Sequence, residues 1–237
     1  MFRETRILMD TSCTITAVSS SEKKAGEAID AGFARIKELE QLLNYFSSTS
    51  EISAINKAAG NNPVKISRET LEAVKKAVEI ADYTHGAFDP TIGPLTKLWG
   101  FSGQNSRPAV PPENEIKNAM NMIDYKKVKI NTSTSEIFLE EKGMALDLGG
   151  IAKGYAADIA IEAIKAKGIK AALVAIAGDI KGFGSKPNQQ PWKVGIQNPR
   201  PNPPAPSFEK GGRGGILKKV EGELSDDIFA TLHLKDK

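Results

Sequence analysis

A glycine-rich turn between Asp147 and Asp158 holds the residue types best suited to binding a charged ligand. It reads Asp-Leu-Gly-Gly-Ile-Ala-Lys-Gly-Tyr-Ala-Ala-Asp and joins the end of an expected strand to the start of an expected helix. Glycine lets the backbone approach a ligand closely, and the first N–H groups of a helix are free to bind an anion. Lys153 adds a positive charge and Asp147 a carboxylate. The turn therefore indicates a phosphate-bearing ligand with a metal ion nearby, with plain packing as the alternative.

A second candidate site lies between His85 and Gly103, where glycine, proline and aromatic residues surround Asp89. Hydrophobic residues in this segment follow neither the helical nor the strand period. Long ordered loops of this kind often carry binding residues, although a packed surface loop has the same composition. Neither segment matches the Gly-x4-Gly-Lys-Ser/Thr pattern of the P-loop or the Gly-x-Gly-x-x-Gly fingerprint of dinucleotide-binding folds. Both of these common phosphate-binding patterns are therefore excluded.

The composition excludes several broad classes of protein. Of the 237 residues, 40% are hydrophobic and 26% are charged, which is ordinary for a soluble chain. The 32 basic and 29 acidic residues give a net charge of +3, so no nucleic-acid partner is expected. No apolar run is long enough to span a membrane, and the N-terminus lacks the apolar core of an export signal. We expect a cytoplasmic protein, with a periplasmic or membrane-anchored lipoprotein as the alternative if a leader has been removed.

Hydrophobic periods and turn signals predict the elements that position these candidates. Expected strands cover residues 6–18, 64–66, 128–130, 137–139, 145–148, 171–177, 180–183, 192–197 and 228–234. A helix is expected from a cap at 20–22 to an end near 44–48, with others over about 51–58, 67–85, 112–123 and 151–167. The elements mix without a regular βαβ alternation, and residues 127–140 read as a hairpin. We therefore expect one α+β domain with a mixed, largely antiparallel sheet and packed helices.

Several separated motifs occur together along the chain, and both their order and their spacing are informative. They are Met9-Asp10-Thr11, Phe46 followed by Ser50 to Asn56, Gly86 to Phe101, Asp147 to Ala156, and Ala177 to Ile180. In this combination the chain resembles the ApbE family, the FAD:protein FMN transferases. The family usually has glycine where this chain has Asp10. The resemblance extends from about Ile7 to Pro199 and implies the α+β fold of the family.

The resemblance implies an enzyme that depends on Mg²⁺ and cleaves the pyrophosphate of FAD. It would move the FMN half onto a Thr or Ser hydroxyl of a target protein and release AMP. Implied partners are the flavin-acceptor subunits of membrane redox complexes. No catalytic residue is assigned, and the backbone carbonyl of Gly150 is the implied metal ligand. The implied FAD-binding residues are Met9, Phe46, Ala87, Phe88, Asp89, Asp147 and Lys153.

The resemblance also divides the chain. Residues 1–199 correspond to an incomplete FAD-binding domain, residues 200–226 to a Pro- and Gly-rich insertion expected to be disordered, and residues 227–237 to the start of the family's C-terminal part. The family continues into a His-rich motif and an Asp that completes the metal site, which this sequence lacks. We therefore expect the chain as given to bind FAD poorly and to transfer little FMN. The alternatives are an Mg²⁺-dependent FAD pyrophosphatase that gives FMN and AMP, or a non-catalytic flavin-binding fragment.

Overall fold

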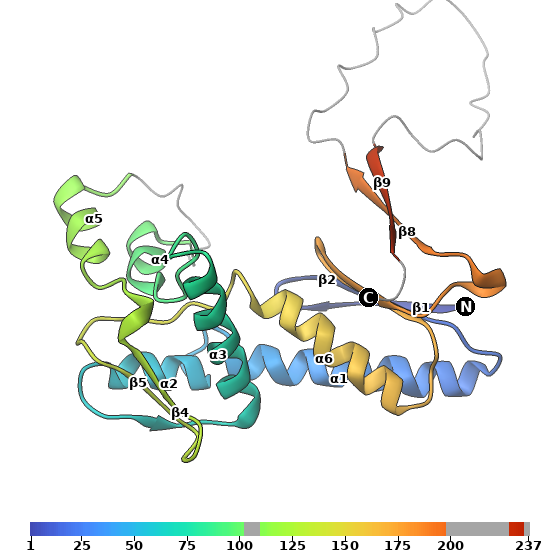
Figure 1. Ribbon diagram of the computed structural model, residues 1–237, viewed down its shortest axis with the longest axis horizontal. Coiled ribbons are helices and arrows are strands. Elements are labelled where there is room, and N and C mark those ends of the chain that lie inside the picture. Colours follow the sequence, from blue (N-terminus) through green and yellow to red (C-terminus); the bar gives the residue numbers. More distant parts are fainter. Residues whose placement is uncertain (102–109, 198–227, 235–237) are drawn as a thin grey trace, which may run out of the picture.

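The computed structural model describes residues 1–101, 110–197 and the backbone of 228–234. One long helix, α1 (Glu22–Leu43), runs along the right-hand half of the molecule in Figure 1 and ends next to the left-hand half. Ser21 caps this helix because its side chain accepts a hydrogen bond from the backbone N–H of Lys24. Its buried residues recur at helical spacing along one face: Ala25, Ala28, Ile29, Gly32, Phe33, Ile36, Leu39 and Leu43.

The first half is a four-stranded sheet with helices packed on one side. The strands are β1 (Phe2–Leu8), β2 (Thr11–Ala17), β6 (Ala172–Ile176) and β7 (Asp179–Phe183), in the order β1-β2-β6-β7 with antiparallel pairing throughout. Alternate residues of β2 and β6 are buried, as expected for a sheet covered on one face. A Cβ at Gly32 of α1 would lie 2.8 Å from the side chain of Ile15, so glycine allows the helix to approach β2 closely.

Helix α6 (Ala152–Ala166) lies above α1 on the same side of this sheet (Figure 1). Its buried residues are mainly small and include Ala156, Ala157 and Ala160. A Cβ at Gly32 would also lie 3.2 Å from Ile164, which places the two helices in direct contact. The turn that begins with Asp147 is therefore anchored by a helix that is buried along one side.

The second half contains the remaining helices and a smaller sheet. Helices α2 (Glu51–Ala58), α3 (Arg68–Tyr83), α4 (Gly93–Trp99) and α5 (Glu113–Met120) surround β3 (Val64–Lys65), β5 (Glu136–Leu139) and β4 (Val128–Asn131), which pair antiparallel in that order. The short helix η1 (Tyr125–Lys127) leads into β4. A separate hairpin pairs β8 (Trp192–Gln197), which follows the short helix η2 (Pro187–Gln189), with β9 (Ile228–Leu234).

The predicted α+β class with largely antiparallel pairing is confirmed. The single strand predicted over residues 6–18 is wrong, because a turn at Met9 and Asp10 splits it into the β1–β2 hairpin. The strand predicted over 145–148 is reduced to one isolated bridge between Ala145 and Ile92. Helix α4 lies inside the segment predicted as a loop. The division of the chain at residue 199 stays a prediction, since residues 198–227 lie outside the described ranges.

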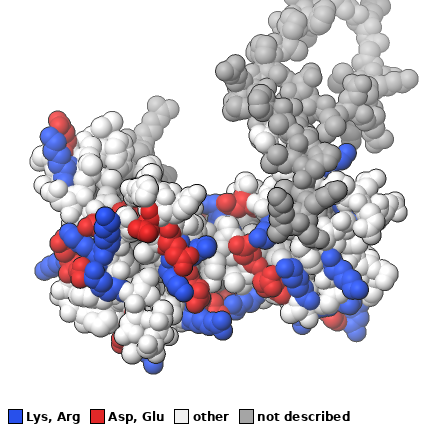
Figure 2. Space-filling model, in the orientation of Figure 1, with Lys and Arg blue, Asp and Glu red and all other residues white. Residues whose placement is uncertain are grey.

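On the face shown in Figure 2, the charges of the described residues are spread rather than concentrated. Lysine and arginine alternate with aspartate and glutamate across the face shown in Figure 2. Pairs such as Lys181–Asp158 at 2.9 Å and Lys165–Glu162 at 2.9 Å join neighbouring positions at the surface. Such exposed pairs contribute about 0–1 kcal/mol each, so the fold depends on its core rather than on them. Among the described helices, none combines the length and the apolar character that crossing a membrane requires.

Candidate functional site

A pocket opens where the β1–β2 turn, the end of α1 and the turn before α6 meet. It brings together Met9, Phe46, Asp147 and Lys153, which the sequence predicted as FAD-binding residues. These side chains come from three separated segments of the chain, so only the fold brings them together. The full lining is Met9, Asp10, Glu40, Leu43, Asn44, Tyr45, Phe46, Asp147, Gly149, Ala152 and Lys153.

The β1–β2 turn forms one wall of the pocket. Met9 and Asp10 both have positive φ, 53° and 56°, in the left-handed region that a tight hairpin turn requires. Asp tolerates this region better than most residues, which explains how Asp10 can stand where the family usually has glycine. The backbone N–H of Met9 donates to Glu40 Oε1 at 2.7 Å. Glu40 of α1 therefore fixes the turn, and with it Met9, over the pocket.

Two adjacent aromatic residues after α1 form a second wall. Phe46 is 53% exposed, an unusual state for a large apolar side chain. The Tyr45 ring meets it edge to face, with centroids 5.1 Å apart, and the Tyr45 hydroxyl donates to the carbonyl of Gly93 at 2.8 Å. Burial raises the pKa of the Tyr45 phenol, and the charge of Asp147 raises it further. Tyr45 therefore stays neutral and packs against Phe46, which lines the pocket.

The carboxylate of Asp147 is held in one orientation. Its Oδ1 accepts a hydrogen bond from the backbone N–H of Gly149 at 2.9 Å, and its Oδ2 accepts one from the Thr96 hydroxyl at 2.8 Å. An ionised carboxylate offers about four lone-pair sites, so about two remain for a ligand. Asp147 can therefore accept N–H or O–H groups of a molecule in the pocket without losing its internal contacts.

The start of α6 presents free donors next to this carboxylate. Ile151 caps the helix without a side-chain hydrogen bond, and the N–H of Ala152 bonds to Leu148 O at 2.8 Å. Over the described residues, the N–H groups of Lys153 and Gly154 have no acceptor, and the Lys153 ammonium has no hydrogen bond or ion pair. Unpaired backbone donors and a lysine at a helix N-terminus attract anions. This end of the pocket is therefore suited to a phosphate group.

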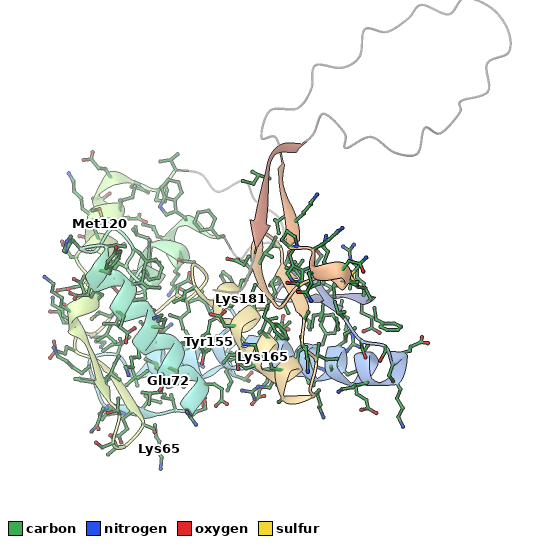
Figure 3. The ribbon with its side chains drawn as sticks, turned by 45° about the vertical axis from the view of Figure 1, so that its right-hand side comes forward. Lys65, Glu72, Met120, Tyr155, Lys165 and Lys181 are labelled. Atoms are coloured by element: carbon green, nitrogen blue, oxygen red, sulfur yellow. The ribbon has the colours of Figure 1, made fainter. Side chains whose placement is uncertain are left out.

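Two further motif residues pack around the same helix. A Cβ at Gly154 would lie 3.7 Å from Asp179 Oδ1, which places the Ala177–Ile180 motif beside the first turn of α6. Tyr155 points the other way, toward α3 and Glu72 (Figure 3), and its hydroxyl donates to Glu69 O at 3.4 Å. Burial raises the pKa of the Tyr155 phenol. Tyr155 therefore belongs to the packing of α6 on α3 rather than to the pocket.

The loop before α4 reaches the site through Phe88. A Cβ at Gly150 would lie 3.1 Å from the edge of the Phe88 ring, so glycine allows this close approach. Ala87 is exposed and Phe88 is partly buried. None of the predicted residues Ala87, Phe88 and Asp89 lines the pocket itself. Their contacts with FAD stay predictions.

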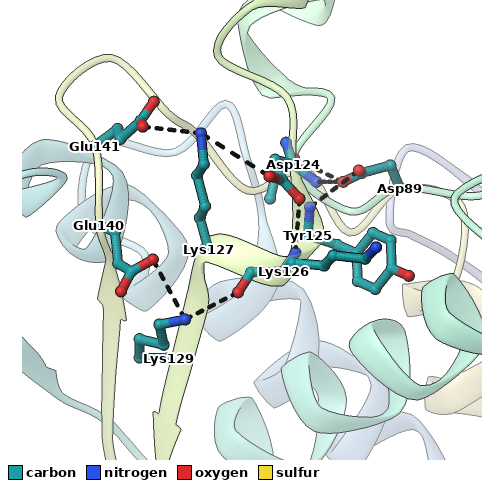
Figure 4. Close-up of polar contacts among 9 residues, drawn as sticks. Asp89, Asp124, Tyr125, Lys126, Lys127, Lys129, Glu140 and Glu141 are labelled. Atoms are coloured by element: carbon teal, nitrogen blue, oxygen red, sulfur yellow. Dashed lines mark hydrogen bonds and ion pairs between the residues drawn. The ribbon is translucent and has the colours of Figure 1, made fainter.

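The Asp89 carboxylate accepts hydrogen bonds from other parts of the protein, as Figure 4 shows. Its Oδ1 accepts hydrogen bonds from the N–H and the hydroxyl of Thr91, at 2.8 and 2.6 Å, and its Oδ2 accepts one from the N–H of Tyr125 at 3.1 Å. The buried Thr91 hydroxyl in turn accepts from the N–H of Asp124 at 2.9 Å. These contacts tie the loop before α4 to η1. Asp89 therefore shapes the backbone that carries Phe88.

The Ser50–Asn56 motif also serves the framework. The Asn56 amide donates to Leu146 O at 2.9 Å and accepts from Leu146 N–H at 2.7 Å, so it pairs with the backbone directly before Asp147. Ser50 caps α2, and the Glu51 carboxylate accepts the N–H and hydroxyl of Ser67 at the start of α3. This motif therefore positions Asp147 from 90 residues away without touching the pocket.

Gly150 is the predicted metal ligand through its carbonyl. It is exposed, and its carbonyl oxygen accepts no hydrogen bond within the described part of the chain. In those same ranges no group of three or more His, Cys, Asp and Glu side chains is placed to hold a metal ion. Mg²⁺ requires about six oxygen ligands in octahedral geometry. The role of the Gly150 carbonyl as a metal ligand stays a prediction.

Glu40, Tyr45 and Thr96 shape the pocket but were not predicted from the sequence. Each acts by a hydrogen bond to a residue distant in the chain: Glu40 to Met9, Tyr45 to Gly93 and Thr96 to Asp147. The proximity of Tyr45 to Phe46 was the only local signal that could have singled out one of them. The other two become visible only when the helices are placed in space.

Comparison with known proteins identifies the family of the chain. The model of the ApbE family matches residues 9–220. The FAD:protein FMN transferase of Klebsiella pneumoniae is 33% identical over 169 residues, which are 70% of this chain and 50% of that protein. The corresponding protein of Vibrio cholerae is 32% identical over 167 residues, 69% of this chain and 48% of its own length. The chain thus spans about half the length of these curated relatives.

Solved structures show the same fold. The crystal structure of the ApbE protein of Thermotoga maritima superposes with a TM-score of 0.82 at 28% identity, covering 99% of this chain and 68% of that one. The apo flavinyl transferase ApbE of Pseudomonas stutzeri gives a TM-score of 0.75 at 28% identity, covering 83% and 61%. Since the family model matches residues 9–220, most of the chain, the chain belongs to the ApbE family.

Proposed function

We propose that this protein is an FAD:protein FMN transferase. One observation carries the proposal: Met9, Phe46, Asp147 and Lys153 meet in one pocket beside the uncapped start of α6. The names of the relatives in Klebsiella pneumoniae and Vibrio cholerae support the same activity. Because the chain spans about half of their length, the activity is a proposal for this protein rather than a consequence of family membership.

The pocket offers suitable groups for two parts of FAD, the flavin and the pyrophosphate. The exposed face of Phe46 can stack on the flavin ring, and Asp147 can accept hydrogen bonds from its N–H or hydroxyl groups. Lys153 and the free N–H groups at the start of α6 can hold the pyrophosphate. These groups would orient the substrate and offset its negative charge, which are the protein's main contributions to phosphoryl transfer.

The proposed reaction exchanges one bond to phosphorus for another. A Ser or Thr hydroxyl of the acceptor protein attacks the phosphorus of the FMN half, and the bond from that phosphorus to the bridging pyrophosphate oxygen breaks. The bridging oxygen leaves with AMP, and the hydroxyl proton is lost to solvent or to the leaving group. The product is FMN joined to the acceptor protein through a phosphoester. No described residue is assigned as the base for this step.

The proposal also includes a magnesium ion and a class of acceptor protein. The Gly150 carbonyl would supply one ligand to a cation that neutralises charge at the pyrophosphate. The acceptor would be a protein presenting Ser or Thr, such as a flavin-carrying subunit of a membrane redox complex. Both statements are tested by varying the assay: omission of Mg²⁺, and replacement of the acceptor hydroxyl by alanine, should each abolish protein-bound flavin.

The decisive experiment mixes the full chain with FAD and Mg²⁺, with and without an acceptor protein. Fluorescence of flavin on the denatured acceptor measures transfer, and chromatography measures free FMN and AMP. Acceptor-bound FMN with an equal amount of AMP supports the proposal. Free FMN with AMP, independent of the acceptor, would indicate an FAD pyrophosphatase instead. FAD binding without either product would leave a flavin-binding protein and reject the transferase.

A further inference from the structure

Thr96 makes an unusual contact for a threonine in a helix. A helical threonine hydroxyl commonly bonds back to the carbonyl of the preceding turn. In α4 the Thr96 N–H bonds to Ile92 O at 3.1 Å, but its hydroxyl donates to Asp147 Oδ2 at 2.8 Å, 51 residues further along the chain. The hydroxyl has one proton to donate, so Asp147 receives it fully. Thr96 thus contacts a pocket-lining carboxylate from outside the pocket.

The backbone around this contact is fixed independently of any ligand. Gly93 N–H donates to Ala145 O at 3.0 Å, and Asp147 N–H donates to Pro90 O at 2.8 Å. A Cβ at Gly93 would lie 2.6 Å from Ala145 O, so α4 begins as close to this segment as backbone allows. The distance between Thr96 and Asp147 is therefore set by the fold before FAD arrives.

We propose that Thr96 is a positioning residue that sets the ligand-accepting orientation of the Asp147 carboxylate. Gly149 N–H holds one carboxylate oxygen and Thr96 holds the other, so rotation of the group is blocked from both sides. The free lone pairs then point in fixed directions, ready for an N–H or O–H group of the flavin or of a sugar. This inference rests on the proposed function, because FAD is the ligand that Asp147 is taken to bind.

The prediction concerns which part of FAD loses affinity. Thr96→Val keeps the shape of the side chain and removes the donor, so the Asp147 carboxylate can rotate. FAD binding should weaken about ten-fold, as expected for one hydrogen bond to a charged group. The loss should fall on one half of the ligand, either FMN or AMP, whichever carries the group that Asp147 accepts. General loosening of the pocket would weaken both halves to a similar degree.

The test uses the full chain and titrates FAD, FMN and AMP separately by calorimetry. Thr96→Ser, which keeps the hydroxyl, should bind FAD within about two-fold of the wild type. Thr134→Val is the matched control, because the Thr134 hydroxyl donates to the Glu136 carboxylate at 2.6 Å on the exposed β4–β5 turn, far from the pocket. This control should leave all three affinities unchanged.

Each outcome either supports or overturns the inference about Thr96. A half-selective loss in Thr96→Val that Thr96→Ser restores supports the inference. Unchanged FAD binding in Thr96→Val, or an equal loss for FMN and AMP, overturns it while leaving the proposed function intact. A wild-type chain that binds neither FAD nor its halves would overturn the proposed function and this inference together.

Discussion

The segments Ser50–Asn56 and Asp147–Gly154 both match the family pattern, but they differ in whether their polar groups have hydrogen-bond partners within the protein. In the first, the side chains of Ser50, Glu51 and Asn56 all bond to other parts of the framework. In the second, the Lys153 ammonium and the N–H groups at the start of α6 have no partner within the described ranges. A family motif can therefore belong either to the framework or to the site. Whether its polar groups have hydrogen-bond partners within the protein distinguishes the two.

The physical reason is the cost of an unpaired polar group. A buried backbone group without a partner costs about 1–3 kcal/mol, so framework motifs are retained to satisfy such groups. At an accessible pocket the cost is small because water takes the place of the ligand. Free donors that converge on one pocket are thus tolerated in the empty protein and become useful when an anion binds. Variants in the two segments should separate stability from binding.

The largest effect is expected for Asn56→Ala. It removes both hydrogen bonds to Leu146 and leaves a backbone N–H and a carbonyl without partners next to Asp147. The free energy of unfolding should fall by about 3 kcal/mol and the melting temperature by about 6–12 °C. Urea denaturation and thermal melting measure both quantities.

A control for Asn56→Ala is Asn62→Ala, at an exposed position whose amide bonds only to its neighbour Pro63 at 3.1 Å. It should change the free energy of unfolding by less than about 0.5 kcal/mol. Equal stability of the two variants would show that the Asn56–Leu146 pairing does not support the framework.

The next largest effect is expected for Lys153→Gln, and it should appear in binding. Because no described group pairs with the Lys153 ammonium, the free energy of unfolding should change by less than about 0.5 kcal/mol. FAD affinity should fall about 10- to 30-fold, as expected for a lost charge-assisted hydrogen bond to phosphate. Added salt should weaken FAD binding in the wild type more than in the variant.

Lys167→Gln provides the matched control, because Lys167 is exposed at the opposite end of the same helix. It removes the same charge from the chain without touching the pocket, so FAD affinity should not change. If Lys153→Gln binds FAD as tightly as this control, the start of α6 is not the pyrophosphate site, and the contrast between the two segments fails.

A smaller effect, on stability alone, is expected for Glu51→Ala. Its carboxylate accepts the Ser67 N–H at 2.9 Å and the Ser67 hydroxyl at 2.7 Å, at the start of α3 and away from the pocket. Unfolding free energy should fall by about 1–2 kcal/mol, and FAD affinity should stay within about two-fold. A strong loss of FAD affinity in a folded variant would place the Ser50–Asn56 segment in the site after all.

Local signals predicted much of the fold. The caps at Ser21 and Ser67 and the apolar periods that follow them located α1 and α3, and alternating apolar residues located the β4–β5 hairpin. The β1–β2 turn was missed because Met9 and Asp10 adopt positive φ without the glycine or asparagine that normally indicates it. Helix α4 had a usable signal, a proline near its start and Gly100 in the left-handed conformation at its end.

The site was predictable only where the family pattern specified residues. Met9, Phe46, Asp147 and Lys153 line one pocket, and their contacts with FAD stay predictions. The hydrogen bonds that Asp89 accepts from Thr91 and Tyr125 could not be predicted from the sequence, because they depend on where η1 lies in the fold. Residues that act through a neighbour leave no trace in residue type or spacing, so sequence reasoning cannot distinguish them from ordinary surface positions.

The smallest effect is expected for Tyr45→Phe, and it depends on pH. At pH 8 the loss of the hydrogen bond to Gly93 should cost about 1 kcal/mol of unfolding free energy. Burial raises the pKa of Tyr45 in the folded protein above its unfolded value of about 10. Above about pH 10 the unfolded chain therefore ionises first and binds fewer protons, so the wild type loses stability as pH rises toward the folded pKa.

Phenylalanine cannot ionise, so the stability advantage of the wild type over Tyr45→Phe should shrink between pH 8 and about pH 11. Urea denaturation at several pH values measures the difference, and other tyrosines contribute equally to both proteins. Tyr83→Phe serves as the control, since Tyr83 is 86% exposed and its removal should give a difference independent of pH. A pH-independent difference for Tyr45→Phe as well would show that the phenol is not buried behind Phe46. Phe46 would then lack its rigid support, and the pocket wall opposite Lys153 would be adaptable rather than preformed.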